Sequence, residues 1–277
     1  MGLSLLESIV YGIISGFSEF LPICPDSHRA LFLHVIGETD DSAIRLSVHL
    51  GAFIALLTLC TPFIAKLNRE RKIASVNHKR RKRQPDMRSL MDIKLTKSAV
   101  IPLMVCMVFY PFVSGFSHRL WVLAILLFLN GCALYFPQFY PRANKDGLTL
   151  TSADGVILGL GAGAGVMPGI SRIGAALSAA SLRGADRRYI MDIIFLLCLP
   201  AVGILLVYDL FAVLAGGATI AFLSLLCYIV AALTSFLGAY FSICMMRFFA
   251  VRAGFTAFAY YSWGLALLSF ILYLTIS

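Results

Sequence analysis

Long apolar stretches make up most of this chain, and two of them are interrupted near the middle by proline and glycine. Six uninterrupted stretches are long enough to cross a bilayer as helices, which takes about 17–25 residues. They cover residues 43–65, 98–116, 119–137, 189–214, 218–246 and 254–276. The interrupted stretches are 4–36, broken at Pro22 and Pro25, and 151–181, broken at Pro168-Gly169. Broken helices at membrane depth are tolerated where they line a cavity inside the protein. We therefore expect an all-α polytopic membrane protein with about six full transmembrane helices and two re-entrant helix hairpins.

The composition agrees with an integral membrane protein. Of the 277 residues, 60% are hydrophobic and 13% are charged, against about 45–50% and about 25% in soluble domains. The apolar stretches lack the strict alternation of membrane β-strands. No basic segment precedes the first stretch, so we expect no cleavable signal peptide. The seven cysteines have no paired spacing, which favours packed side chains over metal ligands or disulfides.

The formal net charge of +9 is concentrated between two predicted spans. Residues 66–97 contain twelve lysines and arginines and three acids. The run Lys79–Arg83 alone is also typical of a nucleic-acid patch. In a membrane protein the positive-inside rule, with anionic lipid nearby, explains it more simply. We expect 66–97 to be a cytoplasmic loop, with the linker 138–150 on the same side, and we expect no nucleic-acid partner.

The two halves of the chain have the same order of elements. Residues 1–137 and 151–277 each begin with an interrupted stretch and continue with spanning stretches. Placing Pro22 over Pro168 also places Asp26 over Arg172. Inverted repeats whose broken helices meet near the bilayer midplane recur in membrane proteins. We expect a single membrane domain, 1–277, made of two inverted repeats, with one pocket built from both interruptions.

The second interruption has the residues of a phosphate site. Arg172 follows Pro168-Gly-Ile-Ser171, where a helix is expected to restart. Helix N-terminal amides and a guanidinium together bind phosphate oxygens. Gly169 and Gly174 allow the backbone to approach an anion, although they equally allow close helix packing. Arg172 favours the phosphate interpretation, because an unpaired arginine at membrane depth needs a partner.

The first interruption has the residues of a catalytic site. Glu19 is a candidate partner of Arg172, a ligand for a divalent cation, or a general base. His28 is a candidate to move a proton or to attack phosphorus, and a structural histidine is the alternative. Among the other histidines, His49 is the one candidate for a supporting role.

These segments resemble a known family. Glu19-Phe-Leu-Pro22 followed by His28, and Pro168-Gly-Ile-Ser-Arg-Ile-Gly174, are similar to the two signature segments of the undecaprenyl pyrophosphate phosphatase (bacitracin-resistance) family. His49-Leu-Gly-Ala52 and Phe195-Leu-Leu-Cys-Leu-Pro200 resemble further family segments. The resemblance implies a multi-pass protein of the bacterial inner (plasma) membrane, with inverted repeats and an outward-opening pocket. It also implies removal of the terminal phosphate of a polyprenyl pyrophosphate, which recycles the lipid carrier for peptidoglycan synthesis.

The chain departs from the family pattern at four positions. Ser15 stands where an acid or glutamine is usual, and Pro25 stands at the position of the candidate serine nucleophile. Ile173 replaces a serine, and Ser262 replaces a C-terminal arginine. Asp26 is available to replace the lost carboxylate. Ser27 or His28 is available as a nucleophile in a shifted geometry.

Two functions therefore stay open. In a divergent phosphatase, Arg172, Ser171, Gly169 and Gly174 would hold the pyrophosphate, while Glu19 and Asp26 would bind Mg²⁺ or Ca²⁺ or position the attacking group. In a non-catalytic relative, the same pocket would bind or translocate a polyprenyl-phosphate lipid, as a flippase does. We favour the phosphatase because Glu19, His28 and Arg172 are all retained. The sequence leaves the identity of the metal open, as well as the choice between a monomer and a homodimer.

Overall fold

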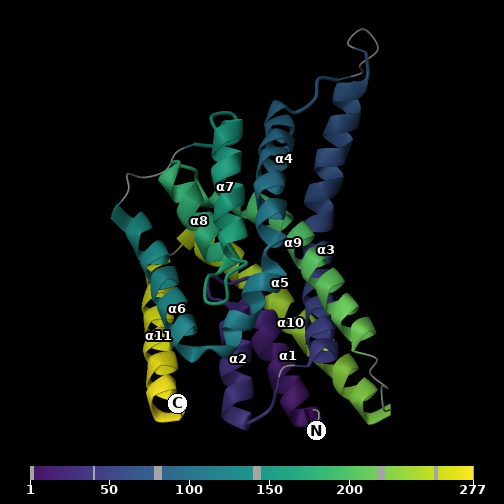
Figure 1. Cartoon of the computed structure of the whole chain (residues 1–277). Helices are drawn as coiled ribbons and strands as arrows, with labels where there is room; N and C mark the ends of the chain where they lie inside the picture. The colour runs from purple at the N-terminus through teal and green to yellow at the C-terminus, as the bar shows by residue number, and fades with distance from the viewer. Residues whose placement is uncertain are drawn as a thin grey trace.

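The regular structure of the protein is helical. The computed structural model describes residues 3–39, 41–77, 83–139, 145–216, 222–252 and 255–276. Within these residues the only β-contact is an isolated bridge between Lys145 and Ala185. The helices run roughly along one direction, with the two chain ends at the same end of the molecule (Figure 1). The expectation of an all-α protein is confirmed.

The first half of the chain contains six α-helices and two short 3₁₀ helices among the described residues. They are α1 (Leu5–Glu19), α2 (Pro25–Ile36), α3 (Ser42–Ser75), α4 (Met87–Met107), α5 (Tyr110–Val113), η2 (Ser114–His118), α6 (Leu120–Tyr135) and η3 (Phe136–Phe139). The second half contains α7 (Ser152–Ala164), α8 (Arg172–Leu182), α9 (Arg187–Ala215), α10 (Phe222–Arg252) and α11 (Thr256–Ile276).

Five described helices are long and apolar enough to cross a membrane, namely α3, α6 with η3, α9, α10 and α11. A sixth crossing results if α4 and the segment Tyr110–His118, which meet at a bend of 46°, are counted as one span. This agrees with the six predicted spans, of which residues 218–221 and 254 lie outside the described part of the chain. The chain is a multi-pass membrane protein.

Both predicted interruptions are real breaks between helices. Pro25 occupies the first turn of α2, where the missing N–H of proline costs nothing. Ser171 caps α8 by accepting a hydrogen bond from Gly174 N, and Gly169 has φ of +106°, which favours glycine. The α1–α2 pair points inward from one end of the molecule and the α7–α8 pair from the other, so their tips meet midway (Figure 1). Their depth in a bilayer, and the inverted repeat itself, stay predictions.

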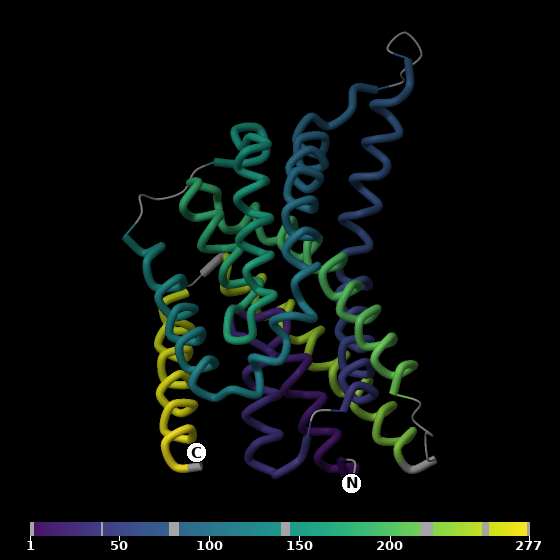
Figure 2. Tube along the Cα trace, viewed as in Figure 1, coloured from purple at the N-terminus to yellow at the C-terminus, as the bar shows by residue number. Residues whose placement is uncertain are grey.

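The prediction of a loop over residues 66–97 is wrong at both ends. Helix α3 continues to Ser75 and α4 begins at Met87. The reason is that lysine, arginine and glutamate are good helix formers, so a helix continues where its hydropathy falls. Lys79, Arg80, Arg81 and Lys82 lie outside the described residues, as do residues 140–144 of the linker. The end of α3 and the start of α4 lie opposite the two chain ends (Figure 2).

The first hairpin is held in place by close packing on α10. A Cβ at Gly12 would lie 2.0 Å from Thr234 Oγ1, and a Cβ at Gly16 would lie 2.0 Å from Ser235 O. Neither distance is compatible with a larger residue unless α1 moves. Small residues at such positions let two helix backbones approach each other in a membrane protein. The glycines therefore fix where the end of α1, and with it Glu19, is placed.

Candidate functional site

The two breaks meet through a buried ion pair. Arg172 Nη1, at the start of α8, lies 3.0 Å from Glu19 Oε1, at the end of α1. Both side chains are buried, with 8% and 1% of their surfaces exposed. A buried charge is stable only when it is paired and hydrogen-bonded. The structure thus brings together the two residues that the sequence singled out as partners.

Further hydrogen bonds join the tips of the hairpins. Ser171 Oγ donates to Leu21 O over 3.0 Å, and Gly169 N donates to Cys24 Sγ over 3.0 Å. These contacts cross from the second break to the first. The expectation that one site is built from both breaks therefore has a direct structural basis.

Asn130 of α6 is a residue of this junction that sequence reasoning missed. Its Oδ1 accepts from Ser171 N at 2.9 Å, and its Nδ2 donates to Pro22 O at 3.4 Å and to Ser262 Oγ at 3.0 Å. The side chain is almost fully buried. An asparagine inside the apolar stretch 119–137 was the available signal, because polar groups at membrane depth are costly unless they have partners.

The predicted phosphate-binding amides already have partners inside the protein. Gly174 N donates to Ser171 Oγ over 3.1 Å. Ser171 N donates to Asn130, and Gly169 N donates to Cys24. These groups hold the junction together instead of pointing unpaired into a pocket. Of the groups predicted to bind phosphate at the second break, the guanidinium of Arg172 is the one with a nitrogen, Nε, that has no hydrogen-bond partner.

Several buried polar atoms of the hairpins have no hydrogen-bond partner. Five such side-chain atoms occur among the described residues, and three of them are Ser15 Oγ on α1, Ser27 Oγ on α2 and Arg172 Nε on α8. Buried polar groups in native proteins are nearly always satisfied, so each exception needs an explanation. For Arg172 Nε, a bound oxyanion would supply the missing acceptor.

The structure gives His28 partners other than Glu19. Its Nε2 lies 2.7 Å from Tyr261 Oη, and its ring stacks on that tyrosine at a centroid distance of 5.7 Å. Its Nδ1 lies 2.6 Å from Cys24 O, which can only accept. No hydrogen bond in the described part of the chain joins His28 to Glu19, Asp26 or Arg172. The arrangement suits a histidine that orients the start of α2 against α11.

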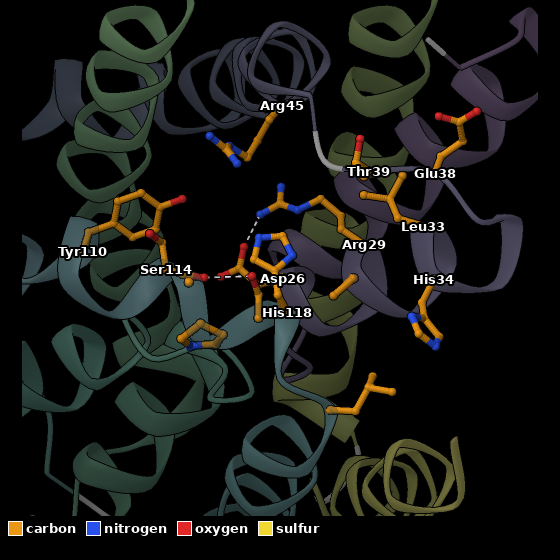
Figure 3. Close-up of a pocket in the computed structure, with 15 residues that line it drawn as sticks. Asp26, Arg29, Leu33, His34, Glu38, Thr39, Arg45, Tyr110, Ser114 and His118 are labelled. Carbon is orange, nitrogen blue, oxygen red and sulfur yellow. Dashed lines mark hydrogen bonds and ion pairs between the residues drawn. The ribbon is translucent and has the colours of Figure 1, made fainter. Parts of the chain in front are cut away.

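A polar cavity of about 260 Å³ adjoins the junction. Its wall includes one residue from each break, Asp26 and Pro168. Arg29 and Arg45 face it from α2 and α3, and Tyr110 and Ser114 line the opposite side (Figure 3). The cavity lies where α3 begins, away from the basic end of that helix. The two arginines in its wall suit a charged head group.

Behind the cavity wall lies a chain of buried polar residues. Asp26 pairs with Arg29, whose Nη1 lies 2.9 Å from His49 Nε2. His49 Nδ1 lies 2.5 Å from Asp209 Oδ2, and Asp209 Oδ1 lies 2.6 Å from Arg45 Nε. Because a guanidinium only donates, Nε2 of His49 accepts, so the ring is neutral with its proton on Nδ1. This chain fixes both arginines that line the cavity.

Sequence reasoning recognised only part of this chain. His49 was the one histidine expected to have a supporting role, and Asp26 was a candidate carboxylate. Arg29, Arg45 and Asp209 were missed. Asp209 stands inside the apolar stretch 189–214, and an isolated acid there is itself a sign of a buried partner.

The described residues do not form a preassembled metal site. They contain no group of three or more His, Cys, Asp or Glu side chains placed to hold a metal ion. Glu19 is paired with Arg172 and Asp26 with Arg29, so each predicted metal ligand already has a cationic partner. Hard divalent cations take several oxygen ligands, more than these two carboxylates supply.

Comparison with known proteins identifies the family. The model of the family described as "Bacitracin resistance protein BacA" matches residues 8–268. The chain belongs to the BacA family. The matched range includes both breaks and every residue of the cavity and of the polar chain behind it. The predicted family resemblance is therefore confirmed.

Curated relatives of this BacA-family chain are similar over nearly their whole length. The protein named "Undecaprenyl-diphosphatase" of Halothermothrix orenii is 26% identical over 274 residues, covering 98% of each chain. That of Methanobrevibacter smithii is 26% identical, covering 97% of each chain. "Undecaprenyl-diphosphatase 1" of Frankia alni is 28% identical, covering 96% of this chain and 95% of its own.

Proposed function

We propose that this BacA-family protein hydrolyses undecaprenyl pyrophosphate to undecaprenyl phosphate and inorganic phosphate, recycling the lipid carrier of cell-envelope synthesis. Family membership and relatives named undecaprenyl-diphosphatase support the proposal. The structural observation that carries it is the Glu19–Arg172 pair at the meeting point of two broken hairpins, with Arg172 Nε buried and unpaired. A guanidinium with a spare donor in a water-poor site is suited to a phosphate oxygen.

Phosphoryl transfer mainly requires positioning and charge neutralisation. Arg172 would neutralise the terminal phosphate, while Arg29 and Arg45 would hold the head group in the neighbouring cavity. The phosphorus–oxygen bond to the bridging oxygen breaks, and the lipid monophosphate leaves with that oxygen. An oxygen from water ends on the released phosphate, either directly or after a phosphorylated intermediate.

Ser27 is the hydroxyl that we propose for such an intermediate. Its oxygen is buried and has no hydrogen-bond partner, and it lies two residues beyond Pro25 on the first turn of α2. Glu19 would accept the proton or orient the attacking group once phosphate competes for Arg172. In this scheme His28, which is hydrogen-bonded to Tyr261, would help to orient α2. Its alternative role as a proton carrier would require the imidazole to turn away from Tyr261.

The cavity is proposed to open on the outer face of the bacterial inner membrane. It lies at the end where α3 begins, whereas four of the five Lys and Arg residues of α3 (Lys66, Arg69, Arg71 and Lys72) lie toward the other end of this helix, which is about 50 Å long. The positive-inside rule assigns that basic end to the cytoplasm. The substrate head group would then enter from outside.

Phosphate release from undecaprenyl pyrophosphate by the purified protein in detergent tests this function. Wild type, Glu19→Gln, Arg172→Ala and Ser27→Ala are compared at equal concentration. We expect the wild type to release phosphate. The rate of phosphate release should fall by about 100-fold or more in Glu19→Gln and in Arg172→Ala. His28→Ala and Ser27→Ala separate the two candidate nucleophiles, since loss of the true nucleophile removes the burst of undecaprenyl phosphate that leaves when the enzyme is phosphorylated.

The metal prediction is tested in the same assay. If metal is required, phosphate release occurs with Mg²⁺ or Ca²⁺ and is lost when a chelator is added. A weaker response to metal in both Asp26→Asn and Glu19→Gln would then support both carboxylates as ligands. Activity that survives chelation would reject that role.

Translocation of a polyprenyl-phosphate lipid is the second candidate. It is favoured by Pro25, which removes the usual hydroxyl. A second cavity also lies between α3, the start of α9 and the end of α10, with a volume of about 420 Å³ and with Arg188, Asp192 and Arg247 in its otherwise apolar wall. Absence of phosphate release, together with lipid binding that requires Arg172, would favour this function over hydrolysis.

A further inference from the structure

A largely apolar groove lies between the membrane helices near the basic end of the molecule, away from the candidate active site. It has a volume of about 470 Å³. Its walls are α3 and α4, and α9 contributes to its floor. The lining residues are Ile64, Leu67, Asn68 and Arg71 of α3, Ile93, Thr96, Lys97, Val100 and Ile101 of α4, and Leu196 of α9.

The polarity of the groove changes along its length. Helix α3 runs toward the basic end and α4 runs back from it (Figure 1). Arg71, the last lining residue of α3, is therefore at the same end as the first lining residues of α4. Ile64 and Ile101 lie at the other end, toward the middle of the molecule. A lipid in a leaflet has the same polarity, with a charged head at the surface and hydrocarbon below it.

The two cations of the groove have no carboxylate partner. Arg71 and Lys97 are exposed, and neither takes part in an ion pair among the described residues, whereas Arg69, Arg83 and Arg88 nearby all do. No acidic residue lines the groove. Two unpaired cations above an apolar channel are complementary to one anionic head group.

A third feature points to a ligand with oxygen atoms. Thr96 lines the groove one residue before Lys97, and its hydroxyl oxygen is buried without a hydrogen-bond partner. A threonine in a helix usually satisfies its hydroxyl on a carbonyl of the preceding turn. Thr96 Oγ1 is therefore available to donate to a phosphate or ester oxygen at the level of Lys97.

We propose that this groove binds one anionic glycerophospholipid from the leaflet at the basic end. Its phosphate is bound by Arg71 and Lys97 with Thr96 beside them, and an acyl chain follows Val100 and Ile101 toward the bilayer centre. Beyond Ile101, the exposed residues Val105 and Val108 continue the apolar surface along which the chain extends. The site is separate from the phosphatase site in both position and chemistry.

Native mass spectrometry of the purified full-length protein tests this site. The protein is presented with phosphatidylglycerol and phosphatidylcholine at equal concentration in a mild detergent. We expect one tightly retained phosphatidylglycerol per chain in the wild type. Arg71→Gln/Lys97→Gln should reduce its retention by roughly tenfold or more, since each cation near a head group contributes to binding.

The matched control is Lys72→Gln/Lys94→Gln. It removes the same charge from exposed positions of the same two helices, next to the groove but not in its lining. This control should retain the lipid as the wild type does. Equal loss in both double variants would mean that only the overall charge attracts the lipid, and the site would be rejected. Equal retention of phosphatidylcholine, or no retained lipid in a folded wild type, would also reject it.

Val100→Trp fills the apolar part of the groove without changing charge. We expect it to weaken phosphatidylglycerol retention while leaving phosphate release in detergent unchanged. Retention that is insensitive to this change would place the lipid elsewhere. Because the readout is lipid retention, failure of the phosphatase proposal would leave this test unaffected.

Discussion

Single residues at the centre of this protein are stabilised by partners far away in the chain. Glu19 depends on Arg172, and Arg45 on Asp209. In low-dielectric surroundings the loss of one partner is costly, because the other is left charged and unpaired. The polar chain that fixes Arg29 and Arg45 is therefore best probed by changes that keep or remove its hydrogen bonds without adding charge.

Replacement of His49 separates hydrogen bonding from shape. His49→Gln can accept from Arg29 through its carbonyl and donate to Asp209 through its amide. We expect it to stay within about 1 kcal/mol of wild type and to keep its activity. His49→Leu leaves an unmet donor and an unmet acceptor and should cost about 2–3 kcal/mol. Denaturant titration in micelles measures both, and equal stabilities would contradict the assigned neutral tautomer.

Asp146, ahead of α7, gives the chain a pH-dependent contact outside the spanning helices. The backbone N–H of Leu148 and then the guanidinium of Arg88 hold the pKa of its carboxyl below the ordinary 3.8. Because the pKa of the Asp146 carboxyl is lower in the folded than in the unfolded protein, the carboxyl gives its full stabilisation at pH values above its ordinary pKa. That stabilisation is lost as the pH falls through the lower, folded-state pKa. The melting temperature of wild type should therefore exceed that of Asp146→Asn at pH 7, and the difference should vanish in strong acid. A difference that grew on acidification would contradict this sign.

At the scale of elements, the tips of the two hairpins form one structural unit. The bonds from Ser171, Gly169 and Asn130 cross between helices that are distant in sequence. Such a junction sets the distance between Glu19 and Arg172 more rigidly than either hairpin alone. Its geometry should therefore influence catalysis even where a residue does not touch the substrate.

Asn130→Leu tests the junction. The change keeps the side-chain volume similar but leaves Ser171 N and Pro22 O without their partner. We expect a loss of about 2–4 kcal/mol in stability and a fall in kcat larger than the rise in KM. Thermal unfolding and steady-state phosphate release provide these readouts. The control is Leu129→Ala, an exposed neighbour on the same helix, and a comparable fall in kcat there would argue against a specific role for Asn130.

At the scale of the whole molecule, the polar cavity and the basic helix ends occupy opposite ends. Single cysteines test whether these ends face opposite sides of the membrane. In a background that lacks the seven native cysteines, Glu38→Cys at the cavity should react with an impermeant maleimide added to intact cells. Ser75→Cys should react only after the cells are opened. Labelling of both positions in intact cells would contradict the proposed orientation.

Local signals were enough to predict the helices and the breaks from the sequence. Apolar runs marked the spans, and Pro25 and Pro168 marked the interruptions. The Glu19–Arg172 pair could be predicted because an unpaired charge at membrane depth is costly. The partners of Asn130 and of His28 were not predicted, since a neutral polar side chain can be satisfied by many groups and carries no charge that selects one of them. The extension of α3 to Ser75 was missed because hydropathy detects burial in lipid and not the end of a helix.

The packing of the first hairpin also constrains how the chain is assembled. Helix α1 has 15 residues and α2 has 12, so each is shorter than a typical membrane crossing. The surface that receives Gly12 and Gly16 belongs to Thr234 and Ser235 of α10, which the ribosome makes more than 200 residues later. Until α10 has been synthesised, the hairpin lacks the partner that lets its broken backbone lie inside a bilayer. The first segment to leave the ribosome is thus among the last to reach its final position.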